Sequence, residues 1–154
     1  MLILPTGCGS GNDAEQASVE AEPTAVSEEN EIKKVTISCA GDVTLGTDES
    51  FGGYTMPEVM ADKNNDYSYL FSNVKEIFEN DDLTIVNFEG TLTDRGVRQD
   101  KTFAFKADPE YVQALSAGSI EAVTLANNHS SDYGEESAED TKKYLEDAGI
   151  IWFE

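Results

Sequence analysis

Short apolar segments alternate with amphipathic segments from residue 32 to the end of the chain, and this order restricts the possible folds. Alternating or continuous apolar runs predict strands over residues 35–40, 83–88, 102–106 and 120–125, with a further strand beginning at 150. Apolar side chains at helical spacing predict helices over residues 69–80, 109–117 and 135–148. Strands and helices in this order form parallel sheets with crossover helices, so we expect a layered α/β sheet with flanking helices.

The length of 154 residues, with 39% hydrophobic residues, suits one domain over residues 32–154. The chain ends at Ile151-Trp152-Phe153-Glu154, inside what should be a core strand. A domain rarely ends at such a place. We therefore expect this sequence to be a truncated fragment, the N-terminal part of a longer protein.

Residues 1–31 differ in composition from the rest of the chain and are expected to form a leader and a linker. Four apolar residues, then small residues and Cys8 followed by Gly and Ser, resemble the end of a bacterial lipoprotein signal with Cys8 as the lipidated residue. The apolar run is shorter than in a usual signal, and a chance cysteine in a disordered terminus is the alternative. Residues 9–31 contain no Lys or Arg and many acids, which predicts a disordered, extended linker.

Net charge and metal-binding residue types exclude some function classes. The chain has 31 acidic and 10 basic residues, a net charge of -21, and such a surface repels nucleic-acid phosphates. We therefore expect no nucleic-acid partner. With two cysteines and one histidine, a Cys/His zinc cluster is not available within the chain.

Polar residues stand at the ends of three predicted strands. They are GDVTLG with Asp42, NFEG with Asn87 and Glu89, and NNHS with Asn127, Asn128 and His129. Because the carboxyl ends of parallel strands line one edge of a sheet, these side chains are expected to meet there. Two carboxylates, an amide oxygen and an imidazole suit a divalent metal such as Mn, Fe or Zn.

Each of these residues also has a plainer explanation. Asp42 could cap a helix, and Glu89 could be exposed in a turn. Asn127 and Asn128 could be ordinary turn residues, and His129 a hydrogen-bonded loop histidine. Their occurrence at three successive strand ends nevertheless favours a shared site.

The segments GDVTLG, VNFEGTLTD, FAFKADPEYVQAL and TLANNHSSDYG resemble, in order and spacing, the CapA family of bacterial poly-γ-glutamate capsule synthesis proteins. The resemblance runs from Val35 to the C-terminus, and NNHSSDYG is its most specific part. It implies a fold similar to the calcineurin-like metallophosphoesterases, of which the family looks like a divergent branch.

By position, the resemblance implies that Asp42, Glu89 and Asn128 are metal ligands and that His129 is the catalytic histidine. Asn87 and Asn127 would hold these ligands in position without binding the metal themselves. The sequence departs from the phosphoesterase pattern at Thr44, where those enzymes usually have histidine, and at Glu89, where they use aspartate. The histidines that complete the phosphoesterase site lie downstream of the motifs present in this chain.

Two functions follow from the resemblance. The first is a metal-dependent hydrolase in capsule synthesis or export, anchored by lipid to the extracytoplasmic face of the bacterial membrane. The second is a non-catalytic capsule-assembly or polymer-binding lipoprotein. The expected partners are the capsule polymer or its synthesis and export machinery. Because poly-γ-glutamate is not a phosphoester, the sequence leaves the substrate open.

Overall fold

The computed structural model describes residues 33–154, in which a four-stranded sheet is central. Its strands lie in the order β1 (Ile37–Val43), β2 (Leu83–Phe88), β5 (Ala122–Thr124) and β6 (Ile151–Phe153). Each strand is parallel to its neighbour. A second, two-stranded parallel sheet joins β3 (Thr91–Leu92) to β4 (Lys106–Ala107). The predicted α/β class with a parallel sheet is therefore confirmed.

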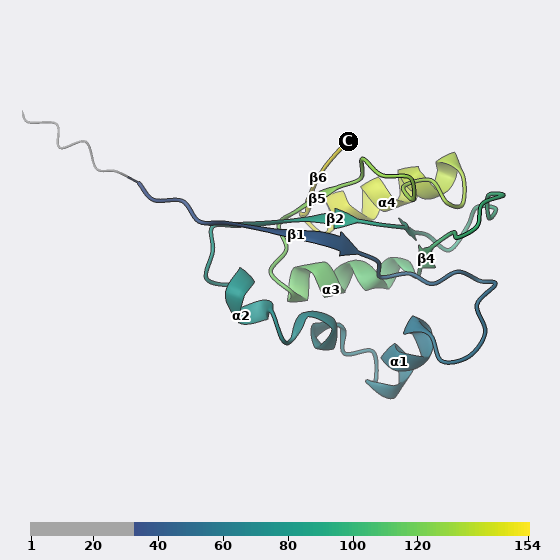
Figure 1. Cartoon of the computed structure of the whole chain (residues 1–154), viewed down its shortest axis with the longest axis horizontal. Coiled ribbons are helices and arrows are strands. Elements are labelled where there is room, and N and C mark those ends of the chain that lie inside the picture. Colours follow the sequence, from purple (N-terminus) through teal and green to yellow (C-terminus); the bar gives the residue numbers. More distant parts are fainter. Residues whose placement is uncertain (1–32) are drawn as a thin grey trace, which may run out of the picture. The chain divides into compact units, whose positions relative to one another are not determined.

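Helices cover both faces of the four-stranded sheet. In Figure 1, α4 (Glu135–Asp147) and α3 (Val112–Ala117) lie on opposite sides of it. The connection between β1 and β2 carries α1 (Met56–Asp62), the 3-10 helix η1 (Tyr67–Phe71) and α2 (Lys75–Phe78). A further 3-10 turn, η2 (Pro109–Tyr111), leads directly into α3.

The hydrophobic core lies between the sheet and these helices. Side chains from β2, β5, α3 and α4 pack together there, among them Phe88, Val123, Leu115 and Leu145. Burial of side chains of this size stabilises a fold by roughly 1.5–3 kcal/mol each. This packing fixes the strands, and with them the loops at their carboxyl ends.

The strand register brings the three polar motifs to one edge of the sheet. Asp42 pairs with Asn87 across β1 and β2, and Asn87 pairs with Thr124 across β2 and β5. The β1–β2 register shifts between Cys39 and Asp42, so β1 has one more residue than β2 in this interval. A bulge of this kind changes the face on which later side chains lie, and here it sets Asp42 opposite Asn87.

The predicted helix over residues 69–80 is wrong in its bounds and continuity. The structure has η1 and α2 as two short helices instead of one. The Asp66 side chain accepts the Ser68 backbone N–H at 3.1 Å and starts the first helix early. The Asn80 side chain donates to the Glu76 carbonyl at 2.6 Å, and such local bonds compete with helix hydrogen bonding.

The predicted strand over residues 102–106 is also wrong in extent, since its ladder pairing begins at Lys106. The Ala104 N–H donates to Asp48 Oδ2 at 2.7 Å, and the Phe105 N–H donates to Asp132 Oδ2 at 2.6 Å. Two buried carboxylates thus take the amide groups that a strand partner would otherwise bind.

Helix α1 was absent from the sequence prediction although its start has a recognisable signal. The Glu58 carboxylate accepts the Thr55 backbone N–H at 2.8 Å and the Thr55 hydroxyl at 2.6 Å, and Pro57 stands in the first turn. Thr, two residues and Glu form the capping-box pattern that begins helices. The remaining predicted elements occur with bounds shifted by a few residues at most.

The predicted leader and linker over residues 1–31, with Cys8, lie outside the described residues. Within residues 33–154, none of the helices has the length and apolar character required to cross a membrane.

Candidate functional site at the strand ends

The six predicted site residues of the folded part lie at the carboxyl ends of β1, β2 and β5, and we call them the strand-end cluster. Asn87 is its centre. The Asn87 Nδ2 donates to Asp42 Oδ1 at 2.8 Å and approaches Glu89 Oε1 at 3.5 Å. One amide group therefore lies within reach of both carboxylates. The cluster consists of Asp42, Asn87, Glu89, Asn127, Asn128 and His129.

Asn127 connects the β5 end to the β2 end. Its Nδ2 donates to Asn87 Oδ1 at 2.9 Å and to the Phe88 carbonyl at 2.8 Å. Its Oδ1 accepts the His129 backbone N–H at 2.9 Å. These bonds occupy both ends of the Asn127 side chain, so it holds the neighbouring residues in place and has a defined position itself.

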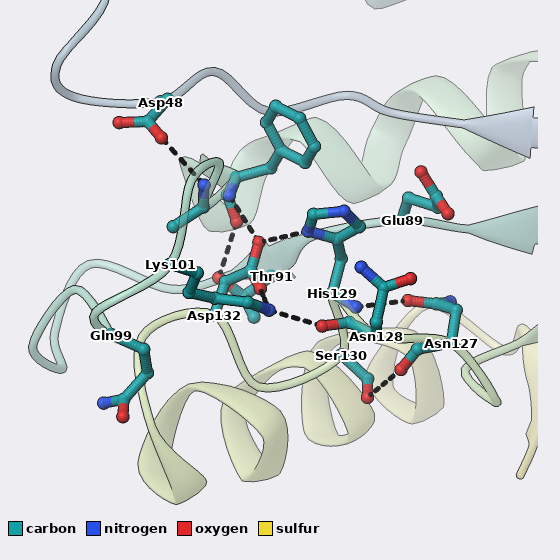
Figure 2. A network of polar contacts seen from close by, with 12 residues as sticks. Asp48, Glu89, Thr91, Gln99, Lys101, Asn127, Asn128, His129, Ser130 and Asp132 are labelled. Carbon is teal, nitrogen blue, oxygen red and sulfur yellow. Dashed lines mark hydrogen bonds and ion pairs between the residues drawn. The ribbon is translucent and has the colours of Figure 1, made fainter.

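The His129 imidazole is half-buried and has contacts on two sides. Its Nδ1 lies 2.8 Å from Asp132 Oδ2, and its ring centre lies 4.7 Å from that of Phe105. In the view of Figure 2, the ring lies between Asp132 on one side and Glu89 on the other. The Nε2 atom is the ring nitrogen that Asp132 does not contact.

Asn128 is exposed. Its backbone is held in place by Lys101, a residue of the loop that precedes β4. The Lys101 ammonium donates to the Asn128 carbonyl and to Asp132 Oδ1. Asn127, Asn128 and Ser130 line an open hollow of about 590 Å³ at this edge. The hollow therefore reaches the Asn127–Asn128 side of the cluster, whereas Asp42, Glu89 and His129 do not line it.

Gly46 of the GDVTLG motif has a structural role. A Cβ at this position would lie 2.8 Å from the Lys106 backbone carbon, because the chain after β1 passes directly beside β4. The neighbouring Thr47 exchanges backbone hydrogen bonds with Lys106 at 3.1 and 3.0 Å. This glycine permits the close approach that joins the β1 loop to the small sheet.

Sequence reasoning missed the residues that support His129. Asp132 is fully buried, Lys101 is half-buried, and they form an ion pair. The acid three residues after the histidine, in HSSD, was a signal that could have identified Asp132. Lys101 and Phe105 come from a distant loop, and their residue types mark no such contact.

The donors of the cluster fit a divalent cation by chemical type. Two carboxylates, the Asn128 amide oxygen and the free His129 ring nitrogen are oxygen and nitrogen ligands of the kind that Mn, Fe and Zn accept. Within residues 33–154, no three His, Cys, Asp or Glu side chains are grouped closely enough to hold an ion by themselves. Asp42, Glu89 and His129 are therefore not close enough to hold one ion together, and a cation here would bind at most two of them with amide oxygens as further ligands.

Comparison with known proteins gives relatives in capsule synthesis. The family profile described as "Bacterial capsule synthesis protein PGA_cap" matches residues 36–153. A "Capsule biosynthesis protein CapA" of Bacillus anthracis is 29% identical over 133 residues, which are 84% of this chain and 30% of the Bacillus protein. Proteins of two Mycobacterium tuberculosis strains, each named a probable polyglutamine synthesis accessory protein, are 33% identical over 88 residues. That match covers 55% of this chain and 23% of each mycobacterial protein.

Proposed function

This chain belongs to the bacterial capsule synthesis family whose profile spans residues 36–153, and from that premise we propose that its strand-end cluster is a metal-dependent phosphoesterase-like site. The observation that carries the proposal is the hydrogen bonding of Asn87, whose amide lies within reach of the carboxylates of Asp42 and Glu89. Two like charges at one sheet edge repel each other, and a cation near them would relieve that repulsion.

In this proposal, Asp42, Glu89 and Asn128 hold the cation. A bound divalent metal supplies Lewis acidity and lowers the pKa of a bound water. Asn87 holds Asp42 by a hydrogen bond and lies near Glu89, and Asn127 fixes Asn87.

His129 is the proposed catalytic residue. Its Nε2 is not in contact with Asp132 and is free to hydrogen-bond a phosphoryl oxygen or to give a proton to a leaving oxygen. The hollow lined by its chain neighbours Asn127, Asn128 and Ser130 gives room for part of a substrate at this edge, although His129 itself does not line it.

The proposed setting is the extracytoplasmic face of the bacterial membrane. There the protein would be lipid-anchored through Cys8 and would act with the capsule polymer or its synthesis and export machinery. Family membership supports a role in capsule synthesis. Since the chain spans 30% of the Bacillus relative, the activity and partners of a whole protein of this family are part of the proposal.

A non-catalytic role in capsule assembly or polymer binding is the second candidate, and one observation favours it. The Asn87 amide already binds Asp42 and approaches Glu89 from within the protein, which gives these carboxylates a partner without a metal. The same loops would then serve only as a stable binding surface.

Titration of the chain with Mn²⁺ by calorimetry tests the metal site. We expect Asp42→Asn and Glu89→Gln each to weaken Mn²⁺ binding at least roughly tenfold, since even indirect support of a metal ligand contributes about 10–100-fold in affinity. Glu76→Gln removes the same charge from exposed helix α2, at the opposite end of β2, and is the matched control. Equal affinities in all four proteins would contradict the site.

Hydrolysis of p-nitrophenyl phosphate with Mn²⁺ then separates the two candidates, and it is measured on a protein that extends this chain over the length of the Bacillus relative, because the phosphoesterase pattern has further histidines downstream. Turnover that is lost in His129→Ala while Mn²⁺ binding is kept supports the phosphoesterase. Metal binding without turnover in that longer protein, with His129 unchanged, supports the assembly role.

A further inference from the structure

Asp132 is a buried carboxylate that the proposed reaction does not yet use. Its side chain has no solvent exposure, yet it lies directly behind the His129 ring. Asp132 Oδ1 accepts from the Lys101 ammonium, and Asp132 Oδ2 accepts the Phe105 N–H at 2.6 Å. Oδ2 also lies 2.8 Å from His129 Nδ1. Figure 2 shows these contacts meeting at the one carboxylate.

The chemistry of these partners determines which histidine nitrogen carries the proton. An ionised carboxylate can only accept hydrogen bonds, and Lys101 and the Phe105 amide can only donate them. Nδ1 of His129 must therefore donate to Asp132 as well. In a neutral imidazole the other nitrogen then has the lone pair, so Nε2 is the acceptor.

The position of the ring is fixed together with its tautomer. The His129 backbone N–H donates to Asn127, and Phe105 packs against the ring. Lys101 also donates to the Asn128 carbonyl, so one ammonium group holds both Asp132 and the backbone next to His129. Asp132 and Lys101 thus orient the histidine through its Nδ1 side.

We propose that Asp132, held by Lys101, is a positioning residue that keeps His129 in the Nδ1–H tautomer and presents the Nε2 lone pair to the strand-end cluster. This inference rests on the proposed function for its purpose, because a presented Nε2 is useful to a phosphoryl or metal site. The contact is made by residues of this chain alone, so it can be measured separately from activity.

His129 is the only histidine in the chain, so its ¹⁵N signals can be assigned without ambiguity. We suggest long-range ¹H–¹⁵N NMR of the imidazole on the 154-residue chain, made with a histidine-free tag, in mildly alkaline buffer with a chelator. The chelator keeps the ring free of metal, and the ¹⁵N signals themselves distinguish the two neutral tautomers from the doubly protonated ring. We expect the unchanged chain to give the Nδ1–H pattern, and a predominant Nε2–H pattern there would overturn the proposal.

Three variants show whether Asp132 is responsible. Asp132→Ala removes the acceptor and should give a mixture of both tautomers. Asp132→Asn offers one accepting oxygen and one donating NH2 group where the carboxylate accepts from Lys101, the Phe105 N–H and the ring. An NH2 group that faces Nδ1 donates to it, so the share of the Nε2–H tautomer should rise above that in the unchanged chain. Asp48→Ala removes another buried carboxylate that does not contact His129, and it should leave the tautomer unchanged while lowering stability.

Failure of this inference can be told from failure of the proposed function. The Nδ1–H pattern together with absence of turnover in the p-nitrophenyl phosphate assay would reject the phosphoesterase and keep the positioning role. Turnover together with the Nε2–H pattern would reject the positioning role alone. If Asp132→Ala does not fold, the unchanged chain and Asp132→Asn still decide the question. A predominant Nε2–H pattern in the unchanged chain, or the same tautomer distribution in both proteins, contradicts the proposal.

Discussion

Two buried aspartates, Asp48 and Asp132, bind neighbouring amide groups of one loop and yet have different surroundings. The Ala104 N–H donates to Asp48 at 2.7 Å, and the next amide, that of Phe105, donates to Asp132 at 2.6 Å. Neither carboxylate is exposed to solvent. Both therefore hold the segment before β4 in the same way, by accepting backbone hydrogen bonds that a strand would otherwise use.

The two carboxylates differ in their cationic partners. Asp48 binds the Arg98 guanidinium through two hydrogen bonds, at 2.7 and 3.1 Å. Asp132 binds Lys101 through one oxygen and contacts His129 through the other. The side chain that Asp48 pairs with, Arg98, lies outside the strand-end cluster. Asp132, by contrast, also contacts His129, which belongs to that cluster. The comparison indicates that the same arrangement stabilises the loop in one place and orients a proposed catalytic group in the other.

The largest expected effect is on stability, for Asp48→Ala. Removal of one partner of a buried ion pair destabilises proteins by about 3–5 kcal/mol, and this change also leaves the buried Ala104 N–H without its acceptor. We expect a loss of this size in the free energy of unfolding, measured by urea denaturation. Asp94→Ala, at an exposed position in the nearby loop, is the control and should change stability by less than about 0.5 kcal/mol. Similar losses in the two variants would contradict the scaffold role of Asp48.

A smaller effect is expected for Lys101→Met, which removes the cationic partner of the other carboxylate, Asp132. Asp132 keeps the Phe105 N–H and the His129 contact after this change, so we expect a loss of about 1–3 kcal/mol, typical of an incompletely satisfied buried polar group. Arg98→Met is the matched comparison, and its loss should be larger, since Asp48 has no second side chain with a ring or ammonium group to replace the guanidinium. The reverse order in urea denaturation would show that the two carboxylates are not stabilised as the comparison requires.

The parts of the fold that depend on local pattern were predicted from the sequence. The β2 bounds, 83–88, agree with the structure because LTIVNF is a short, largely apolar run with two aspartates before it and Glu89-Gly90 after it. Helix α4 was also predicted, since its apolar spacing and the glycine after it are local signals. The same reasoning predicted that Asp42, Glu89 and His129 would lie at one sheet edge, where the structure places them.

The parts that depend on distant side chains were not predicted. Asp48 and Ala104 are 56 residues apart, and Asp132 and Phe105 are 27 apart, so no local pattern showed that these carboxylates would bind the loop amides. The alternation in residues 102–106 therefore predicted a strand that these bonds replace. The bulge that sets Asp42 opposite Asn87 also depends on pairing between strands, and a single strand sequence does not reveal it.

The smallest expected effect, and the most specific to the Asp48 pair, is on the acid dependence of stability. The Arg98 hydrogen bonds, helped by the Ser50 and Ala104 amides, hold the pKa of Asp48 well below its usual range, against the opposing effect of burial. In the unfolded chain this carboxyl group titrates near the ordinary value of about 3.9. Its stabilising contribution is therefore complete above about pH 4 and decreases as the pH falls toward the folded pKa, because the unfolded state binds the proton first.

Urea unfolding between pH 6 and pH 2.5 measures this contribution. We expect Asp48→Asn to lower the slope of unfolding free energy against pH by up to about 1 kcal/mol per pH unit below pH 4, and to leave the slope above pH 5 unchanged. The remaining acid slope includes Asp140, since hydrogen bonding by the Arg95 guanidinium also lowers the pKa of that carboxyl group. Asp140→Asn in the same background should therefore flatten the acid slope further. Equal slopes in the unchanged chain and Asp48→Asn would mean that the buried Asp48–Arg98 pair does not persist in solution. Asp48 could then no longer serve as the structural counterpart with which Asp132 is compared.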